Sequence, residues 1–247
     1  MIDGTKTTFD WQASATDIAV LPVGSFEQHS SHLPLLTDDI LAEHFGRMAA
    51  EELDAALLPV MNFGTCFEHS AFRGSVTLRP ETQMAIVRDV AAAVERHGFR
   101  FLVIVNSHGG NFSLLPPARE INTQNRPLKV VLVNWWEYCD PDCVSDKIPI
   151  AGEVHAGAWE TSIMLALRPE LVGNDRRDRV VDPTDPLPLV QRDLTMFGSG
   201  HLAPGGAIGH PSKAKVEIGQ AALRSIRQNL GRYLRDRIAR LRKNPIY

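Results

Sequence analysis

Three short segments, far apart in the chain, combine carboxylate and imidazole side chains. They are GSFEQHSSHLPLLTDD (24–39), VIVNSHGGNF (103–112) and EVHAGAWETS (153–162). Their acids and histidines with ligand-like spacing are Glu27, His29, Asp38, His108, Glu153, His155 and Glu160. Carboxylate and imidazole without thiolate form a donor set that suits zinc, manganese or iron. The residues therefore predict a metal centre, and an acid that bridges two ions would allow a pair.

If the substrate is an amide, such a centre can hydrolyse it. A divalent ion lowers the pKa of bound water from about 15.7 to about 7, so metal-bound hydroxide can attack a carbonyl without a serine or cysteine nucleophile. The leaving nitrogen then needs a proton. His155 is the expected donor because imidazole titrates near neutral pH. Glu153 is expected to orient His155 from behind.

Each segment is a weak signal when taken alone. A lone Glu-x-His pair is common, and a histidine beside glycines is more often a hydrogen-bonded structural group than a ligand. The competing interpretation is three polar loop clusters that cap helices. The remaining histidines of interest are expected outside the ligand set: His32 as a loop-packing residue, and His69, beside Glu68, as a residue that lines the pocket.

Apolar runs precede the first two polar segments. Four continuous, β-branched runs, at 18–23, 57–61, 101–105 and 130–133, predict strands that are covered on both faces. In open α/β sheets, ligands gather beyond the carboxyl ends of the strands. The polar segments lie at that topological position.

Helical patterns alternate with these runs. We expect helices at 37–53, 81–98, 158–167 and 212–243. Thr37 is the expected N-cap of the first, which places Asp38 in its first turn. Residues 173–211 are rich in Pro, Gly and Asp and are expected to form long loops.

The alternation of strands and helices predicts one domain over residues 1–247. Its fold class is α/β, a three-layer α/β/α sandwich with a mostly parallel central sheet and a long C-terminal helix. The chain length and the apolar share of 44% allow a sizeable core.

Charge argues against nucleic acid as a partner. The formal net charge is −3 and the pI is about 6.3, whereas domains that bind nucleic acid carry a basic excess. One face of the C-terminal helix is nevertheless basic, and we interpret it as a solvated face rather than an RNA or membrane surface. Its arginines are Arg224, Arg227, Arg232, Arg235, Arg237, Arg240 and Arg242.

The location expected from the sequence is cytoplasmic, with no membrane partner. No apolar stretch approaches the roughly 18 residues of a membrane span, and MIDGTKTTFDW does not resemble a signal peptide. Cys66, Cys139 and Cys143 form no CxxC pair and are expected to be buried, unpaired residues.

Four ordered motifs resemble the creatininase (creatinine amidohydrolase) family. They are GSFEQHSSHLPLLTDD, VNSHGGN, HAGAWETSIMLALRPELV and GGAIGHPSKA, and the resemblance runs from about Ile18 to Gly219. It implies a three-layer α/β/α hydrolase with two divalent metal ions, with zinc the first expectation and manganese or iron the alternatives. It also implies a homo-oligomer, a hexamer by analogy, that opens amide bonds in small molecules.

Carried over by position, the resemblance implies a ligand set for each ion. One ion would be held by Glu27, Asp38 and His108. The second would be held by His29, the bridging Asp38 and Glu160. His155 aligns with the family's acid or base.

The chain departs from the family at several positions. Creatininase proper has a glutamate ligand where this chain has Gly110, and Glu160 is the expected replacement. Ala151 and Gly152 stand in place of aromatic and acidic substrate contacts, which argues against creatinine itself. His210 stands where most relatives carry aspartate.

The predicted function is a divalent-metal-dependent amidohydrolase that cleaves a C–N bond in a cyclic amide, a formamide or a small amide or peptide. Two alternatives stay open at this stage. Gly110 and the altered substrate contacts would suit a metal-binding subunit without catalysis. A lactone or ester hydrolase with the same ions differs only in the leaving atom.

Overall fold

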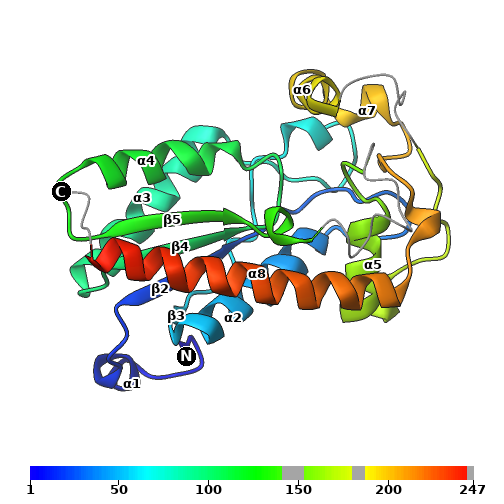
Figure 1. Ribbon diagram of the computed structural model, residues 1–247. Coiled ribbons are helices and arrows are strands. Elements are labelled where there is room, and N and C mark those ends of the chain that lie inside the picture. Colours follow the sequence, from blue (N-terminus) through cyan, green and yellow to red (C-terminus); the bar gives the residue numbers. More distant parts are fainter. Residues whose placement is uncertain (141–152, 180–186, 244–247) are drawn as a thin grey trace.

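A parallel sheet of five strands lies at the centre of the molecule (Figure 1). The structure is a computed structural model that describes residues 1–140, 153–179 and 187–243. The strand order is β1-β3-β2-β4-β5, and each pair is parallel. The strands are β1 (Ile2–Asp3), β2 (Ile18–Val23), β3 (Ala56–Leu57), β4 (Phe101–Asn106) and β5 (Lys129–Asn134).

Helices cover both faces of this sheet (Figure 1). On one side lie α2 (Thr37–Leu53) and α8 (Val216–Lys243), with α5 (Ala158–Leu167) packed against α8. On the other side lie α3 (Pro80–Arg96) and α4 (Leu115–Thr123). Each side has its own buried apolar cluster against the sheet. The predicted α/β/α sandwich with a parallel sheet is confirmed.

The two central strands set the position of the polar segments. Every residue of β2 and β4 is buried, as expected for strands covered on both faces. Their register pairs Val23 with Asn106, so both strands end at the same edge of the sheet. The chain that follows each strand therefore leaves the sheet at one place.

The predicted strand at 57–61 is wrong in its extent. The regular strand β3 covers only Ala56–Leu57, and an isolated bridge then joins Met61 to Val23. Pro59 has no N–H to donate to a ladder, so the run cannot continue as a regular strand.

Three helix starts differ in detail from the expectation. α8 begins at Val216 and not at residue 212, because a 3-10 turn occupies Pro211–Lys213. Leu36 is the N-cap of α2, and Thr37 is its first residue, with its hydroxyl donating to the main-chain oxygen of Pro34 at 2.7 Å. Asp38 lies in the first turn, as predicted. The helix α3 starts one residue early because Pro80 occupies its first position, which needs no N–H donor.

The expectation of long loops throughout 173–211 is wrong. Two helices, α6 (Leu187–Phe197) and α7 (Ser199–Leu202), lie there, above the carboxyl edge of the sheet (Figure 1). Leu194 is buried in a small cluster with Ala203 and Ile208, so packing against neighbouring loops stabilises a helix that the flanking Pro and Gly residues concealed.

Several short elements complete the described part of the chain. They are the helix α1 (Thr8–Ala13) and the 3-10 turns η1 (Phe67–His69), η2 (Phe112–Leu114), η3 (Trp135–Tyr138), η5 (Pro169–Leu171) and η6 (Pro211–Lys213). Cys66 and Cys139 are buried and free, and Cys143 lies outside the described residues. None of the described helices has the length and apolar character that crossing a membrane requires.

The arginine face of α8 pairs in part with acids of the same molecule. Arg227 donates to Glu51 at 3.0 Å, and Arg235 pairs with Glu52, both on α2. Arg242 pairs with Asp17. These contacts favour the interpretation of a solvated face that helps to hold α8 beside α2.

Candidate metal centre

Asp38 lies between two histidines from different segments. Its Oδ1 is 3.4 Å from Nε2 of His29, and its Oδ2 is 3.3 Å from Nδ1 of His108. The side chain is buried. Burial opposes its ionisation, but the imidazoles of His29 and His108 outweigh that effect and lower the pKa of Asp38 below its usual value. Asp38 is therefore an anion that both segments share.

Glu27 enters the same hollow from the chain that follows β2. Its carboxylate is fully buried, with Oε2 3.1 Å from Nε2 of His108. The hydroxyl of Ser25 donates to Oε2 at 2.7 Å and so fixes the rotamer. Burial raises the pKa of Glu27 to about 7. A cation beside Glu27 would favour its ionised form.

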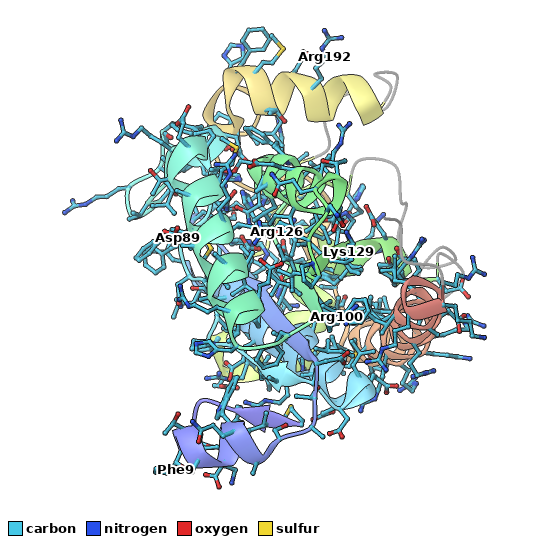
Figure 2. The ribbon with its side chains drawn as sticks, turned by 90° about the vertical axis from the view of Figure 1, so that its left-hand side faces the viewer. Phe9, Asp89, Arg100, Arg126, Lys129 and Arg192 are labelled. Carbon is cyan, nitrogen blue, oxygen red and sulfur yellow. The ribbon has the colours of Figure 1, made fainter. Side chains whose placement is uncertain are left out.

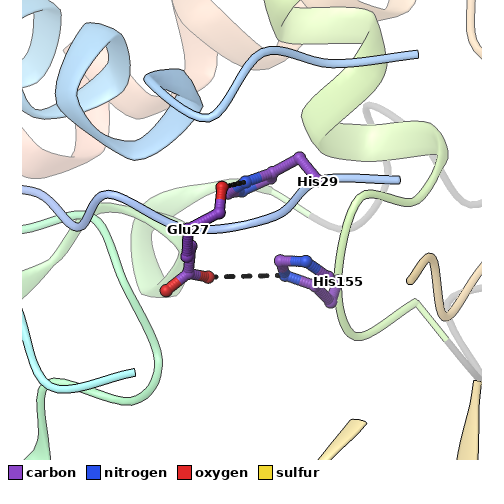
Figure 3. Close-up of side chains that lie close together, drawn as sticks. All are labelled: Glu27, His29 and His155. Atoms are coloured by element: carbon purple, nitrogen blue, oxygen red, sulfur yellow. Dashed lines mark hydrogen bonds and ion pairs between the residues drawn. The ribbon is translucent and has the colours of Figure 1, made fainter. Parts of the chain in front are cut away.

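The ring of His29 is oriented by its own segment. Its Nδ1 lies 3.1 Å from the main-chain oxygen of Glu27, so Nδ1–H donates to that oxygen and Nε2 is the nitrogen that faces the hollow (Figure 3). Nε2 is buried without a hydrogen-bond partner, and Oε1 of Glu160 lies 3.5 Å away. Nε2 is therefore placed to bind a cation once it loses its proton.

Glu160 reaches the hollow from the first turn of α5. Its Oε2 accepts from the main-chain N–H of Ala156 at 2.8 Å. Ala156 has a φ of 48°, in the left-handed region, where alanine is uncommon. This turn places Oε1 of Glu160 opposite His29.

His108 is held by a tight loop after β4. Asn106 accepts from the main-chain N–H of His108 at 3.2 Å and donates to its main-chain oxygen at 2.9 Å. Asn111 donates to Asn106 at 3.0 Å and to the main-chain oxygen of Gly24 at 3.0 Å. These bonds join the loop after β4 to the loop after β2, and so bring His108 to Glu27 and Asp38.

His155 faces the same acids with one nitrogen. Its Nε2 donates to the main-chain oxygen of Gln28 at 2.8 Å, so Nδ1 carries the lone pair and lies 3.9 Å from Oε1 of Glu27 (Figure 3). The ring packs 4.5 Å from that of His29 and 4.3 Å from that of His69. Burial lowers the pKa of His155 to about 4, which keeps the ring neutral.

The prediction that Glu153 orients His155 is not what the structure shows. The carboxylate of Glu153 instead accepts from the main-chain N–H of Ala158, at the start of α5, at 2.6 Å. Its other oxygen accepts from the main-chain N–H and from Nδ1 of His210, at 2.8 and 2.9 Å. The N-terminus of α5 attracts the Glu153 carboxylate, because a helix N-terminus carries partial positive charge, and Glu153 therefore points away from His155. His210 therefore pairs with Glu153, and a main-chain oxygen orients His155.

Two residues near the centre, His69 and Glu68, were not placed among the metal-site residues by the sequence analysis. His69 is buried, with Nε2 3.2 Å from Oε1 of Glu27 and Nδ1 2.9 Å from the side chains of both Gln28 and Ser199. Oε1 of Glu68 lies 3.2 Å from Nε2 of His108. No spacing pattern marks these residues, because η1 joins the centre only through tertiary packing.

His32 has a packing role, as expected. It is buried, and its Nε2 lies 2.9 Å from the hydroxyl of Thr161 on α5. Ala151 and Gly152, which the sequence linked to substrate contacts, lie outside the described residues.

The donor atoms fit a pair of ions that share Asp38. Ligand atoms of Glu27, Asp38 and His108 lie within 4.8 Å of one another, as do those of His29, Asp38 and Glu160. Donors bound at about 2.1 Å in a tetrahedron are about 3.4 Å apart. The contacts of Asp38 with His29 and His108, and of Glu160 with His29, lie at 3.3 to 3.5 Å.

Unpaired buried atoms support the same fit. Oε1 of Glu27, Nε2 of His29 and Oδ2 of Asp38 are buried and have no hydrogen-bond partner. Such atoms cost free energy unless something pairs with them, and a cation would do so. Glu27, His29 and His155 form a third group of convergent donors.

A cavity of about 450 Å³ opens over these residues. The indole side chains of Trp135, Trp136 and Trp159 form part of its wall. Leu194 of α6 closes one side, whereas Arg192 of the same helix points away from the body of the protein (Figure 2). The centre therefore opens into a small pocket with both apolar and acidic surfaces.

Comparison with known proteins gives one consistent family. The family described as creatininase, creatinine amidohydrolase, matches residues 4–234. Creatinine amidohydrolase of Pseudomonas putida is 27% identical over 91% of this chain and 91% of its own length. The mycofactocin precursor peptide peptidase of Mycolicibacterium smegmatis is 30% identical over 84% of this chain and 80% of its own.

Solved structures agree with the sequence relatives. A crystal structure of creatinine amidohydrolase (creatininase) has a TM-score of 0.78 at 26% identity, covering 94% of this chain and 96% of that one. A structure described as creatininase Mn has a TM-score of 0.76 at 25% identity, covering 96% of this chain and 98% of that one.

Proposed function

The chain belongs to the creatininase family of amidohydrolases, and on that premise we propose that it opens the C–N bond of a small amide with two divalent ions. The observation that carries the proposal is the position of Asp38. In the described part of the chain, it is the acid that forms close carboxylate–imidazole contacts with both His29 (3.4 Å) and His108 (3.3 Å), and each histidine has another carboxylate beside it. The donor sets are those that the resemblance implied.

The chain's own residues have distinct roles in this proposal. Glu27, Asp38 and His108 hold one ion, and His29, Asp38 and Glu160 hold the other. When bound, such ions make water a nucleophile near neutral pH and polarise the carbonyl of the substrate. Ser25 and the main-chain oxygen of Glu27 hold two of the donors in place before any ion arrives.

His155 moves the protons. Its ring is neutral because burial disfavours the charged form, and its Nδ1 lone pair faces the metal centre. It accepts the proton that water releases on attack and delivers it to the leaving nitrogen. The bond between Nε2 and the main-chain oxygen of Gln28 keeps Nδ1 available for both steps.

The cavity indicates the substrate class. Its volume of about 450 Å³ suits a small molecule or a short peptide end. Its walls combine the three tryptophans with carboxylates, and the residues that line it in the described part of the chain include no lysine or arginine. A neutral or cationic amide fits this surface better than an anionic one.

Zinc is the ion we propose first, with manganese or iron as alternatives, because imidazole and carboxylate donors accept all three. We propose a homo-oligomer as well, by family resemblance. Light scattering during size-exclusion chromatography measures the assembly, and elemental analysis of protein purified without added metal identifies the ions.

The test combines metal content with turnover. We expect about two divalent ions per chain in the wild type. Asp38→Ala should lose both ions and amidase activity while it keeps its circular dichroism spectrum, because Asp38 serves both donor sets. Asp89→Ala, which removes an acid from the outer face of α3 (Figure 2), is the matched control and should keep its metal.

A panel of lactams, formamides, short peptides and lactones decides the reaction. Metal-dependent cleavage of an amide that His155→Ala abolishes supports the proposal. Full activity in stoichiometrically metal-free protein contradicts it. If panel members bind but none is turned over, the chain is a non-catalytic binding subunit. If only lactones are turned over, the bond that the chain cleaves is an ester and not an amide.

A further inference from the structure

One buried acid at the centre belongs to neither proposed donor set. Glu68, in η1, is 7% exposed and lines the cavity. Its Oε1 lies 3.2 Å from Nε2 of His108. Among the described residues, no lysine or arginine forms an ion pair with it. A carboxylate buried in this way needs a partner of positive character.

Gly110 provides the space that this carboxylate occupies. A Cβ at residue 110 would overlap Oε1 of Glu68 and Nε2 of His108, and would lie 2.6 Å from the main-chain oxygen of Thr65. The backbone of Gly110 does not lie in the left-handed region, so its conformation does not require glycine. Glycine is needed here because other atoms fill the space. At the adjacent Gly109, a Cβ would meet nothing within 4 Å.

The contacts of His108 show what Glu68 acts on. Nε2 of His108 lies 3.2 Å from the main-chain oxygen of Thr65 in hydrogen-bond geometry, which assigns the proton to Nε2. Nδ1 is then the nitrogen that binds a cation once it is deprotonated, and it faces Oδ2 of Asp38, an atom without a hydrogen-bond partner. Glu68 and Thr65 therefore lie on the Nε2 side of the ring, together with Oε2 of Glu27, and Asp38 lies on the Nδ1 side.

The loop that carries Glu68 is fixed to the loop that carries His108. The hydroxyl of Thr65 donates to the main-chain oxygen of Gly110 at 2.6 Å. On its other side, the hydroxyl of Ser199 in α7 donates to the main-chain oxygen of Glu68 at 2.8 Å. The fold thus sets the position of the main chain at Glu68.

We propose that Glu68 is a positioning residue of the metal centre, which holds His108 by its Nε2–H side and adds negative charge behind the ring, in the space that Gly110 leaves open. The inference rests on the proposed function, because it assumes that His108 binds an ion. A carboxylate behind a ligating imidazole makes the imidazole a better donor, and losing such a partner typically costs about 10- to 100-fold in metal affinity.

The first experiment measures Zn²⁺ affinity by competition with a chromophoric chelator. Glu68→Ala should bind Zn²⁺ about 10- to 100-fold more weakly than the wild type. Glu68→Gln keeps an oxygen acceptor but loses the charge, and its affinity should lie between the two. Glu120→Ala, which removes an exposed acid from α4, should match the wild type.

The second experiment acts through the glycine. Gly110→Ala should weaken Zn²⁺ affinity because the new methyl group displaces the Glu68 carboxylate or the His108 ring. Gly109→Ala should leave the affinity unchanged because its methyl group meets nothing. Melting temperatures of the metal-free proteins provide the second readout: a positioning role predicts that Glu68→Gln changes metal affinity but not metal-free stability.

The outcomes separate this inference from the proposed function. A wild type that binds two ions, with Glu68→Ala and Glu68→Gln both within about twofold of its affinity, overturns the inference alone. A loss of metal-free stability in Glu68→Gln with unchanged affinity assigns Glu68 a purely structural role and also overturns it. A wild type that binds no divalent ion removes both proposals. If Glu68→Ala does not fold, Glu68→Gln and the two glycine variants decide.

Discussion

At the scale of single residues, the centre is a set of buried acids and imidazoles in which burial opposes the charged forms and neighbouring groups of opposite charge favour them. Burial raises the pKa of Glu27 to about 7 and lowers that of His155 to about 4. His29 is also opposed by burial, but Asp38 and Glu160 outweigh it and raise its pKa well above the usual value. The protonation of these groups must change when a cation binds, because ligands bind metal in deprotonated form.

Metal affinity should therefore depend on pH. In metal-free protein, Glu27 takes up a proton as the pH falls below about 7, and that proton competes with the ion. We expect apparent Zn²⁺ affinity to fall by up to about tenfold per pH unit below pH 7 from this group alone. Chelator competition at a series of pH values measures the slope.

The control for the predicted pH dependence of Zn²⁺ affinity removes the titrating carboxyl group of Glu27. Glu27→Gln should bind more weakly at every pH, with a shallower slope. Calorimetry in two buffers of different ionisation enthalpy should detect protons released on binding by the wild type. An affinity that stays constant from about pH 7.5 to pH 5.5 would contradict the prediction.

At the scale of elements, the site depends on where strands end and on how closely helices approach. The register of β2 and β4 delivers the two loops to one edge, and α5 supplies Glu160 from a third direction. α5 packs against α8, and a Cβ at Gly219 of α8 would overlap the main-chain oxygen of Ser162 in α5. This close approach fixes the height of α5 relative to the sheet.

Gly219→Ala tests the close approach of α5 to α8. The methyl group would push against backbone atoms, which cannot rotate away, so we expect a loss of about 2–3 kcal/mol in the free energy of unfolding. Chemical denaturation of metal-free protein measures it.

Gly231→Ala in the same helix is the matched control. A Cβ there lies 3.1 Å from the flexible side chain of Glu52, which can move. The gain in helix propensity, about 1 kcal/mol, should offset the contact. Equal destabilisation by the two variants would show that the approach of α5 to α8 is not what Gly219 permits.

At the scale of the whole molecule, the metal centre joins segments that are distant in the sequence. Its donors come from the loops after β2 and β4 and from the first turns of α2 and α5. Ions that bind only when these elements are assembled stabilise the folded state by mass action.

Removal of metal should accordingly lower the melting temperature. A free ion concentration about 100 times Kd contributes about 2.7 kcal/mol per site, which corresponds to roughly 5–10 °C for a chain of this size. Differential scanning calorimetry before and after chelation, and after restoration of Zn²⁺, measures the change. Asp38→Ala should melt at the same temperature with and without chelator, and a shift in that variant equal to the wild-type shift would contradict the prediction.

The sequence by itself determined the fold class and the polar segments of the centre. Continuous β-branched runs are readable because strands covered on both faces need apolar residues throughout, and β2 and β4 have them. Acids and imidazoles placed after strands are readable for a similar reason, because parallel strands bring their carboxyl ends to one edge. Asp38 in the first turn of α2 follows from the same logic.

Only the tertiary structure decided how those side chains are oriented and which further residues join them. Glu153 turned to the start of α5 and to His210, because a helix N-terminus and a second histidine compete with His155 for its carboxylate. Glu68 reached His108 across a space that Gly110 leaves open, and α6 formed in a region that reads as loop. These outcomes depend on packing between segments distant in the chain, which local residue patterns do not encode.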